Sequence, residues 1–211
     1  MLGRTHFFIG TAAALAVLQP QTVPALVTGA GAAAIGSLIS DIDVGTSQAH
    51  RDADKIITAT VAVAALTILA EYKLNLGIYR RLTSDSNILR LLAGTAFLLL
   101  CAYGKQQPHR SFMHSFAALA LLTACVDIIY PDASAYFAVG FLSHLVLDVL
   151  NRKPEKLLWP WKKGFCLGLC SARGVVNRAL LGVGMASLTV ILVLSAPAGR
   201  LLAKITRAIY G

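Results

Sequence analysis

Long apolar segments constrain this chain more than any other feature. An α-helix needs about 20 apolar residues to cross the hydrocarbon core of a bilayer, and backbone polar groups there must be bonded within the protein. Segments of helical length recur along the 211 residues, at 23–40, 55–71, 88–104, 112–130, 134–150 and 177–196, with a shorter one at 5–19. The sequence therefore predicts an all-α, polytopic transmembrane helix bundle with six or seven spans.

Composition supports a membrane location. Hydrophobic residues make up 56% of the chain, charged residues only 14%, and the mean hydropathy is +0.68, well above the range of a soluble domain. The longest polar connection has about 25 residues, too few to fold alone, so we expect residues 1–211 to form a single membrane domain. The first apolar segment has a weakly basic start and no small-residue cleavage site before Pro20. We interpret it as a retained helix rather than a secretory signal.

The charge distribution indicates topology. The 19 basic and 10 acidic residues give a net charge of +9, which in a soluble protein would suggest a nucleic-acid partner. In a membrane protein, an excess of lysine and arginine marks cytoplasmic connections, so no direct nucleic-acid partner is expected. The 151–176 connection is rich in basic residues, whereas the Tyr130–Asp132 connection has none. We therefore place 151–176 in the cytoplasm, although the basic 72–87 loop then falls on the opposite side and departs from the rule.

Span alternation brings the polar residues of four helix ends to one face. Counting back from the cytoplasmic 151–176 loop places the N-terminus and the 41–54 loop on the same side. The starts of the first and fifth helices and the ends of the second and sixth then open there. Imidazoles and carboxylates are costly near a bilayer and are common metal ligands. We predict one metal site at the cytoplasmic face, formed by His6, Asp41, Asp43, His109, His114, His144 and Asp148.

Local spacing supports this grouping on two helices. His144 and Asp148 are four residues apart on one expected helix, so both side chains project from the same face. Asp41 and Asp43 flank Ile42 where the second helix leaves the membrane. An extended backbone there would place both carboxylates on one side. Each pair can therefore face one ion.

The segment before the fifth helix adds an expected anion site. Pro108 interrupts the chain, which puts His109 and Arg110 at the mouth of the helix and His114 about one turn inside it. Unpaired amides at a helix start, together with an arginine, bind anionic groups such as phosphate. The metal and anion sites would then adjoin.

This set of residues predicts metal-assisted hydrolysis. Imidazoles with carboxylates suit zinc, manganese or iron better than calcium or magnesium. We expect one or two divalent ions, with zinc or manganese favoured, and a bound water acidified into a nucleophile. Asp43 and Asp148 are candidates for ligand or general base, and Arg110 for holding the anionic group. The predicted substrate is a phosphoester of a membrane lipid or another amphiphile.

Other polar residues have simpler interpretations. His50 stands in a polar loop and is read as an interfacial residue rather than a ligand. Ser115 and Ser143 adjoin histidines, but helix serines more often bond back to a carbonyl than act as nucleophiles. Cys166 and Cys170 could form a metal or redox pair in the basic loop, which is the weaker interpretation.

Two other function classes fit the same sequence. One is an ion or metal transporter, although no repeated halves or broken helices are evident. The other is a non-enzymatic membrane tether for a cytosolic regulator, with the basic 151–176 loop as its binding surface. An intramembrane metalloprotease is disfavoured because no His-Glu-x-x-His motif occurs.

Two further patterns concern packing. Gly29, Gly31 and Gly36 in the second apolar segment predict close approach to a neighbouring helix. In the tail at 198–211, apolar positions alternate with Arg200, Lys204 and Arg207 at helical spacing. This predicts an amphipathic helix on the membrane surface.

Several motifs, in order along the chain, resemble the YdjM-type membrane-bound metal-dependent hydrolases, also described as inner-membrane-associated hydrolases that bind the LexA repressor. The matching motifs are His6, Asp41-Ile-Asp43, His109-Arg110-Ser-Phe-Met-His114-Ser115, Gly140-Phe-Leu-Ser143-His144-Leu-Val-Leu-Asp148 and Leu157-Leu158-Trp159-Pro160. The resemblance covers about residues 6–180. It implies a bacterial inner-membrane location, hydrolase activity at a metal site, and a cytosolic protein partner.

The chain departs from the family pattern at three positions. Ser111 and Met113 replace a glycine and a threonine of the His-Arg motif. Asn177, followed by Arg178, stands where the family commonly has a glutamate. An amide cannot act as an acid or carry charge, so a catalytic role of the family's glutamate would not carry over to Asn177.

Overall fold

The computed structural model describes residues 1–45, 51, 55, 85–171 and 174–200. His50, the 55–71 span beyond Lys55, most of the basic 72–87 loop and the amphipathic tail beyond Arg200 lie outside these residues. The described elements are α1 (Gly3–Leu18), α2 (Val23–Ile39), the 3₁₀ helix η1 (Ser40–Asp43), α5 (Asp85–Gln106), the 3₁₀ helix η2 (Phe112–His114), α6 (Phe116–Ile129), α7 (Pro131–Val149) and α8 (Val175–Leu194). Within these ranges there is no strand beyond isolated bridges, which confirms the all-α prediction.

Three of the described helical segments are long and apolar enough to cross a membrane: Val23–Asp43, Asn87–Gln106 and Val175–Leu194. Gly3–Leu18 and Phe116–Ile129 are apolar but shorter. The span expected at 112–130 is shortened because Ser115 caps α6, accepting a hydrogen bond from the Ala118 amide. A total of six or seven spans stays a prediction.

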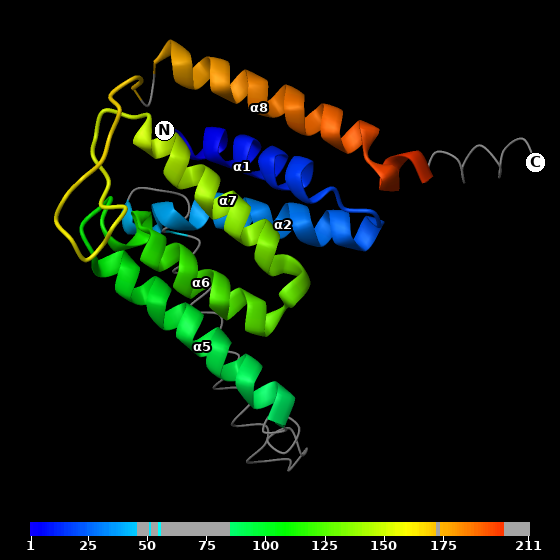
Figure 1. The fold of residues 1–211 in the computed structure, drawn as a ribbon, viewed down its shortest axis with the longest axis horizontal. Helices are drawn as coiled ribbons and strands as arrows, with labels where there is room; N and C mark the ends of the chain where they lie inside the picture. Colours follow the sequence, from blue (N-terminus) through cyan, green and yellow to red (C-terminus); the bar gives the residue numbers. More distant parts are fainter. Residues whose placement is uncertain (46–50, 52–54, 56–84, 172–173, 201–211) are drawn as a thin grey trace, which may run out of the picture.

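The helices pack around α7 and α2. α1, α2 and α7 contact one another, α6 and α5 follow on one side, and α8 contacts α1 on the other (Figure 1). Glycines permit the α2–α7 approach, because a Cβ at Gly36 would overlap the Phe137 carbonyl oxygen and one at Gly140 would overlap that of Ala33. Gly29 meets the Tyr136 ring in the same way. The expectation for Gly31 was wrong, since it faces open space.

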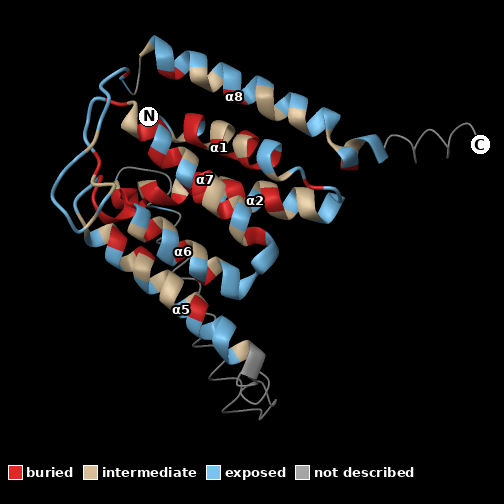
Figure 2. Ribbon diagram, in the orientation of Figure 1, coloured by how far each residue is buried: buried red, intermediate tan, exposed pale blue. Residues whose placement is uncertain are grey.

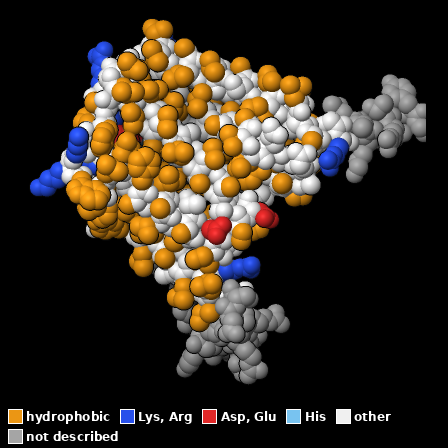
Figure 3. Space-filling model, viewed as in Figure 1, with side chains coloured by type: hydrophobic (Ala, Val, Ile, Leu, Met, Phe, Trp, Pro, Cys, Tyr) orange, Lys and Arg blue, Asp and Glu red, His pale blue; other side chains and the backbone are white. Residues whose placement is uncertain are grey.

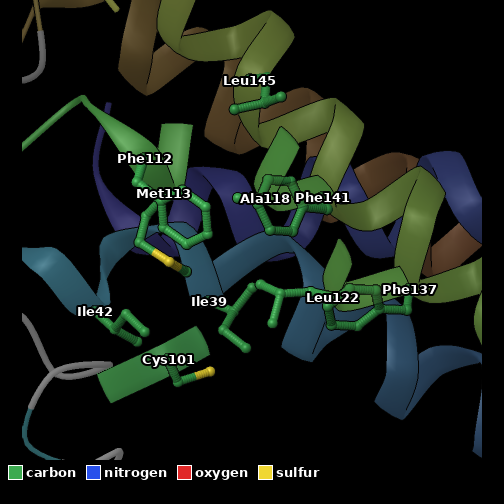
Figure 4. Packing of buried hydrophobic residues seen from close by; sticks show 10 residues of the cluster. All are labelled: Ile39, Ile42, Cys101, Phe112, Met113, Ala118, Leu122, Phe137, Phe141 and Leu145. Carbon is green, nitrogen blue, oxygen red and sulfur yellow. The ribbon is translucent and has the colours of Figure 1, made fainter. Parts of the chain in front are cut away.

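An apolar cluster fixes the two 3₁₀ helices in place. Figure 4 shows Ile42 of η1 and Phe112 and Met113 of η2 among core residues from α2, α5, α6 and α7. Met113 is fully buried and packs where Gly104 of α5 lacks a side chain. The apolar residues of the two 3₁₀ helices therefore anchor them in the core, while the polar residues Asp43 and His114 of the same helices lie near each other.

The exterior is strongly apolar. Hydrophobic side chains are spread over the whole described part of the face shown in Figure 3, with only a few charged side chains among them. Burial is concentrated in the centre of the bundle and at one of its ends, whereas α8 is largely exposed (Figure 2). On α8 the exposed side chains include Val183, Val190 and Leu194. Such a surface suits contact with lipid tails.

The 151–170 segment folds back on the end of the bundle. The Lys156 amide donates to the Arg110 carbonyl at 3.0 Å, and the Phe116 amide donates to the Leu157 carbonyl at 2.9 Å. The Trp159 ring packs edge-on against Phe112, with ring centroids 5.1 Å apart. The Leu-Leu-Trp-Pro segment therefore braces the turn that carries η2.

Candidate metal centre

Four helix ends meet at the end of the bundle that carries the 151–170 segment (Figure 1). α1 contributes His6, and α7 contributes His144 and Asp148. The 3₁₀ helix η1 contributes its two aspartates, and the turn leading into η2 contributes two histidines and Arg110. The convergence expected from span alternation is therefore present.

The backbone at the two aspartates differs from the expectation. Ser40–Asp43 is a 3₁₀ helix rather than an extended segment. Ile42 enters the apolar core, Asp43 is buried, and the Asp41 side chain is 18% exposed. A 3₁₀ helix turns by about a third of a revolution per residue, so the Asp41 and Asp43 carboxylates point in different directions. They belong to different groups of candidate ligands.

The position of His114 also differs from the expectation. It ends η2, before α6, rather than lying one turn inside a helix. The preceding Arg110 has a φ of 64°, in the left-handed region that non-glycine residues rarely adopt. Its amide donates to Asp43 Oδ2 at 3.1 Å. The turn therefore presents its first amide to a carboxylate of the protein, where the sequence had suggested an anionic ligand.

The histidines and aspartates that the structure describes form three overlapping groups, and within each group the candidate ligand atoms lie within 4.8 Å of one another. The groups are His6, His144 and Asp148; Asp41, His114 and His144; and Asp43, His109 and His114. Atoms bound to one ion at about 2.1 Å lie no more than about 4.2 Å apart. Small side-chain movements would thus let each group hold an ion.

Asp43 is surrounded by donors. His109 Nδ1 lies 2.9 Å from Asp43 Oδ1, and His114 Nδ1 lies 3.3 Å from Asp43 Oδ2. The Asp43 side chain is fully buried, whereas that of His109 is 39% exposed. This group therefore joins the buried centre to its outer edge.

Asp148 is the most heavily paired carboxylate. Arg110 donates to Asp148 Oδ2 at 2.6 Å and also to the Lys153 carbonyl. The Met1 amino nitrogen is 2.5 Å and His6 Nε2 is 3.3 Å from Asp148 Oδ1. Arg110 therefore links Asp148 to the backbone of the 151–170 segment.

The histidine nitrogens match the requirements of a metal site. His144 Nδ1 lies 2.7 Å from the Ser37 carbonyl. That bond makes Nδ1 the protonated nitrogen and leaves the lone pair on Nε2, as in metal-binding histidines oriented by a backbone carbonyl. Among the described residues, His144 Nε2 and both ring nitrogens of His6 and His114 are buried and make no hydrogen bond of good geometry. Two of these nitrogens have carboxylate contacts, from His6 Nε2 to Asp148 Oδ1 and from His114 Nδ1 to Asp43 Oδ2, both at 3.3 Å. An unsatisfied buried polar group costs about 1–3 kcal/mol, so their gathering at one point fits ligands for a cation.

A cavity of about 460 Å³ opens onto the centre. Asp41, His109, Arg110 and Asp148 contribute to its wall. Arg152 and Lys153 of the loop line it as well, so cationic side chains flank the carboxylates.

Sequence reasoning missed two contributors. The Ser37 carbonyl carries no signal in the sequence. Glu155 does, since it is the one acidic residue in the basic 151–176 connection. Its side chain is fully buried, and neither carboxylate oxygen has a hydrogen-bond partner in the described structure. The pKa of Glu155 is raised to about 8, because burial and the nearby Asp148 raise it more than Arg110 lowers it.

Other singled-out residues have structural roles. Asn177 Oδ1 accepts hydrogen bonds from Thr5 Oγ1 at 3.0 Å and from the Leu2 amide at 3.3 Å, which tie α8 to α1. Ser143 donates to the Gly140 carbonyl within its own helix. Cys166 is exposed, whereas Cys170 is buried with its thiol on the Leu150 carbonyl. None of these residues belongs to the three candidate metal groups.

Comparison with known proteins gives one family. A family model described as YdjM inner membrane protein matches residues 1–208. No curated protein and no solved structure matches the chain.

Proposed function

The chain belongs to the YdjM inner membrane protein family, and from that membership and the geometry of its His/Asp centre we propose that it is a metal-dependent hydrolase. In this proposal, the chain crosses the membrane six or seven times and has its active site at the cytoplasmic face. The proposed substrate is a phosphoester of a lipid or another amphiphile.

The observation that carries this proposal is the set of buried imidazole nitrogens that lack good hydrogen bonds and lie beside two buried aspartates. A purely structural cluster would pair these nitrogens with donors or acceptors of the protein. His6, His114 and His144 are fully buried, and each belongs to at least one group with metal-ligand spacing. A bound cation would give one nitrogen of a coordinating ring a partner.

The residues divide the chemical work according to their surroundings. A bound divalent ion would supply a Lewis acid and an acidified water. Asp148 lies on the cavity wall but is a candidate metal ligand that also accepts a hydrogen bond from Arg110, so we assign it to ion binding and to holding Arg110. Asp43 is held by His109 and by the Arg110 amide, so we assign it mainly to ligand binding.

Cations at the cavity favour an anionic substrate. Arg110 Nε is buried without a hydrogen-bond partner among the described residues. Arg152 and Lys153 line the same cavity. Together these groups can neutralise a phosphate near the ion. The apolar exterior and the opening at a helix end suit a substrate with a lipid-like part.

Hydrolysis by the purified full chain tests the proposal. Protein in detergent, supplied with zinc or manganese, is expected to release phosphate or the alcohol from a panel of phospholipids and soluble phosphoesters. Chelation should stop the reaction and added metal should restore it. Arg152→Ala with Lys153→Ala should raise KM more than it lowers kcat. Failure of metal-loaded protein to cleave any phosphoester in the panel would contradict the proposed substrate class.

The exposed loop favours a second candidate function, a membrane tether for a cytosolic regulator. Trp161 is 69% exposed, and Lys162 and Lys163 beside it are also exposed. Loss of partner binding after Lys162→Glu with Lys163→Glu, but not after Asp148→Ala, would support it. A transporter is less well supported, because the centre lies at one end of the bundle and transport sites usually lie near the bilayer midplane.

A further inference from the structure

The candidate centre contains more ligand groups than one ion can use. His114 and His144 each belong to two of the three groups. His144 Nδ1 is bonded to the Ser37 carbonyl, so only Nε2 can bind an ion. His144 can therefore serve one ion, not two.

Only one pair of groups shares no residue. These are the group of His6, His144 and Asp148 and the group of Asp43, His109 and His114. A single ion in the middle group, with Asp41, His114 and His144 as ligands, would leave His6 outside the ligand set. Its Nε2 would keep only the 3.3 Å contact with Asp148 Oδ1. Filling the two separate groups gives His6, His114 and His144 a ligand role.

Asp41 lies between the two separate groups. Its carboxylate is close to His114 of one group and to His144 of the other, with Asp41 Oδ1 3.8 Å from His144 Nε2. The Asp41 side chain also lines the cavity. A carboxylate has two oxygens and can bridge a pair of ions about 3.5–4 Å apart.

The two groups differ in access to solvent. The side chains of His6 and His144 are 0% exposed and that of Asp148 is 3% exposed. In the other group, the His109 ring is 39% exposed and lines the cavity. An ion in the first group would exchange slowly, whereas one in the second would meet solvent and substrate.

From this geometry we infer that the centre binds two divalent ions: an inner ion on His6, His144 and Asp148, and an outer, exchangeable ion on Asp43, His109 and His114, with Asp41 between them. The inference rests on the proposed metal-dependent function. It extends that proposal by assigning separate roles to the two ions. The outer position adjoins the cavity and is the one that contacts an anionic substrate.

Manganese binding by the full chain in detergent tests the inference. Equilibrium dialysis of wild type should give two ions per chain, and electron paramagnetic resonance should show spin-coupled manganese, as expected for ions about 4 Å apart. His109→Ala should bind one ion, without the coupled signal, and His6→Ala should also bind one. Thr189→Ala, an exposed substitution on α8, is the matched control and should bind two.

The outcomes separate this inference from the proposed function. One ion in wild type, lost in both histidine variants, would overturn the two-ion inference and leave a one-ion hydrolase. Two ions retained in His109→Ala would overturn the ligand assignment. No bound manganese or zinc in folded wild type would overturn both proposals. Because the His109 ring is partly exposed, its variant provides a test even if His6→Ala does not fold.

Discussion

Helices α7 and α8 have similar lengths and opposite roles. α7 spans 19 residues, of which eight are buried, including His144 and Asp148. α8 spans 20 residues, of which only Asn177 and Gly184 are buried. Hydropathy identifies α8 as a candidate membrane span but not α7. The candidate ligands His144 and Asp148 therefore lower the hydropathy of α7, although α7 lies at the centre of the bundle.

The largest effect of a substitution is expected at Asp148 of α7. Replacing Asp148 with Asn removes the charge that pairs with buried Arg110. We expect the free energy of unfolding to fall by about 3–5 kcal/mol, with loss of bound metal. Asp132→Asn, at the exposed start of the same helix, should change little. Thermal unfolding in detergent, with metal analysis, would measure both; equal effects of the two substitutions would contradict the contrast.

Close packing offers a second comparison. A methyl group at Gly36 would overlap the Phe137 carbonyl, whereas one at Gly182 of α8 meets nothing within 4 Å. We expect Gly36→Ala to destabilise the protein by about 2–3 kcal/mol and Gly182→Ala to be neutral or slightly stabilising. Denaturant titration of the two variants would compare them. Equal tolerance at both positions would show that α2 and α7 are not closely packed.

The loop over the site predicts a pH dependence. The folded pKa of Glu155 is about 8, above its usual value of 4.5, so the folded state binds this proton more tightly. The corresponding stability is complete below the usual value and is lost as pH rises through 8. Between pH 6 and 8, metal-free wild type should lose about 2 kcal/mol that Glu155→Gln does not lose. Thermal unfolding would measure the stability of both proteins against pH. If the two stability curves run parallel, the pKa of Glu155 is not raised in the folded state.

The smallest effect is expected at the contact between α8 and α1. Asn177→Ala removes the acceptor for Thr5 and the Leu2 amide, which should cost about 1 kcal/mol. Metal content should stay unchanged, because Asn177 lies outside the candidate groups. Metal analysis beside a stability measurement would separate the two effects. Loss of metal in this variant would show that α8 contributes to the centre.

Sequence patterns predicted the parts of the site that regular helices fix. The spacing of His144 and Asp148 places both on one helix face, and span alternation brings four helix ends together. The 3₁₀ conformation of Ser40–Asp43 was not predictable in the same way, because it depends on Ile42 packing into a core assembled from distant helices. The Ser37 carbonyl that orients His144 has no side-chain signal.

The His-Arg segment shows a similar limit. Its apolar run suggested a helix from residue 112, yet the core takes Phe112 and Met113 in a 3₁₀ helix and Ser115 caps α6. Tertiary packing and capping thus outweighed helical periodicity. Glu155 could have been noticed as a lone acid among basic residues, but its burial depends on how the loop folds over Arg110.

Elemental analysis of the purified full chain is the direct test of whether the His/Asp centre binds metal. The protein is purified in detergent without added metal or chelator, beside His114→Ala. We expect at least one zinc or manganese ion per folded wild-type chain and a clear loss in folded His114→Ala, since His114 belongs to two of the three candidate groups. Folded wild-type protein that contains no metal, and takes up none when zinc or manganese is supplied, would show that the His/Asp centre is not a metal site.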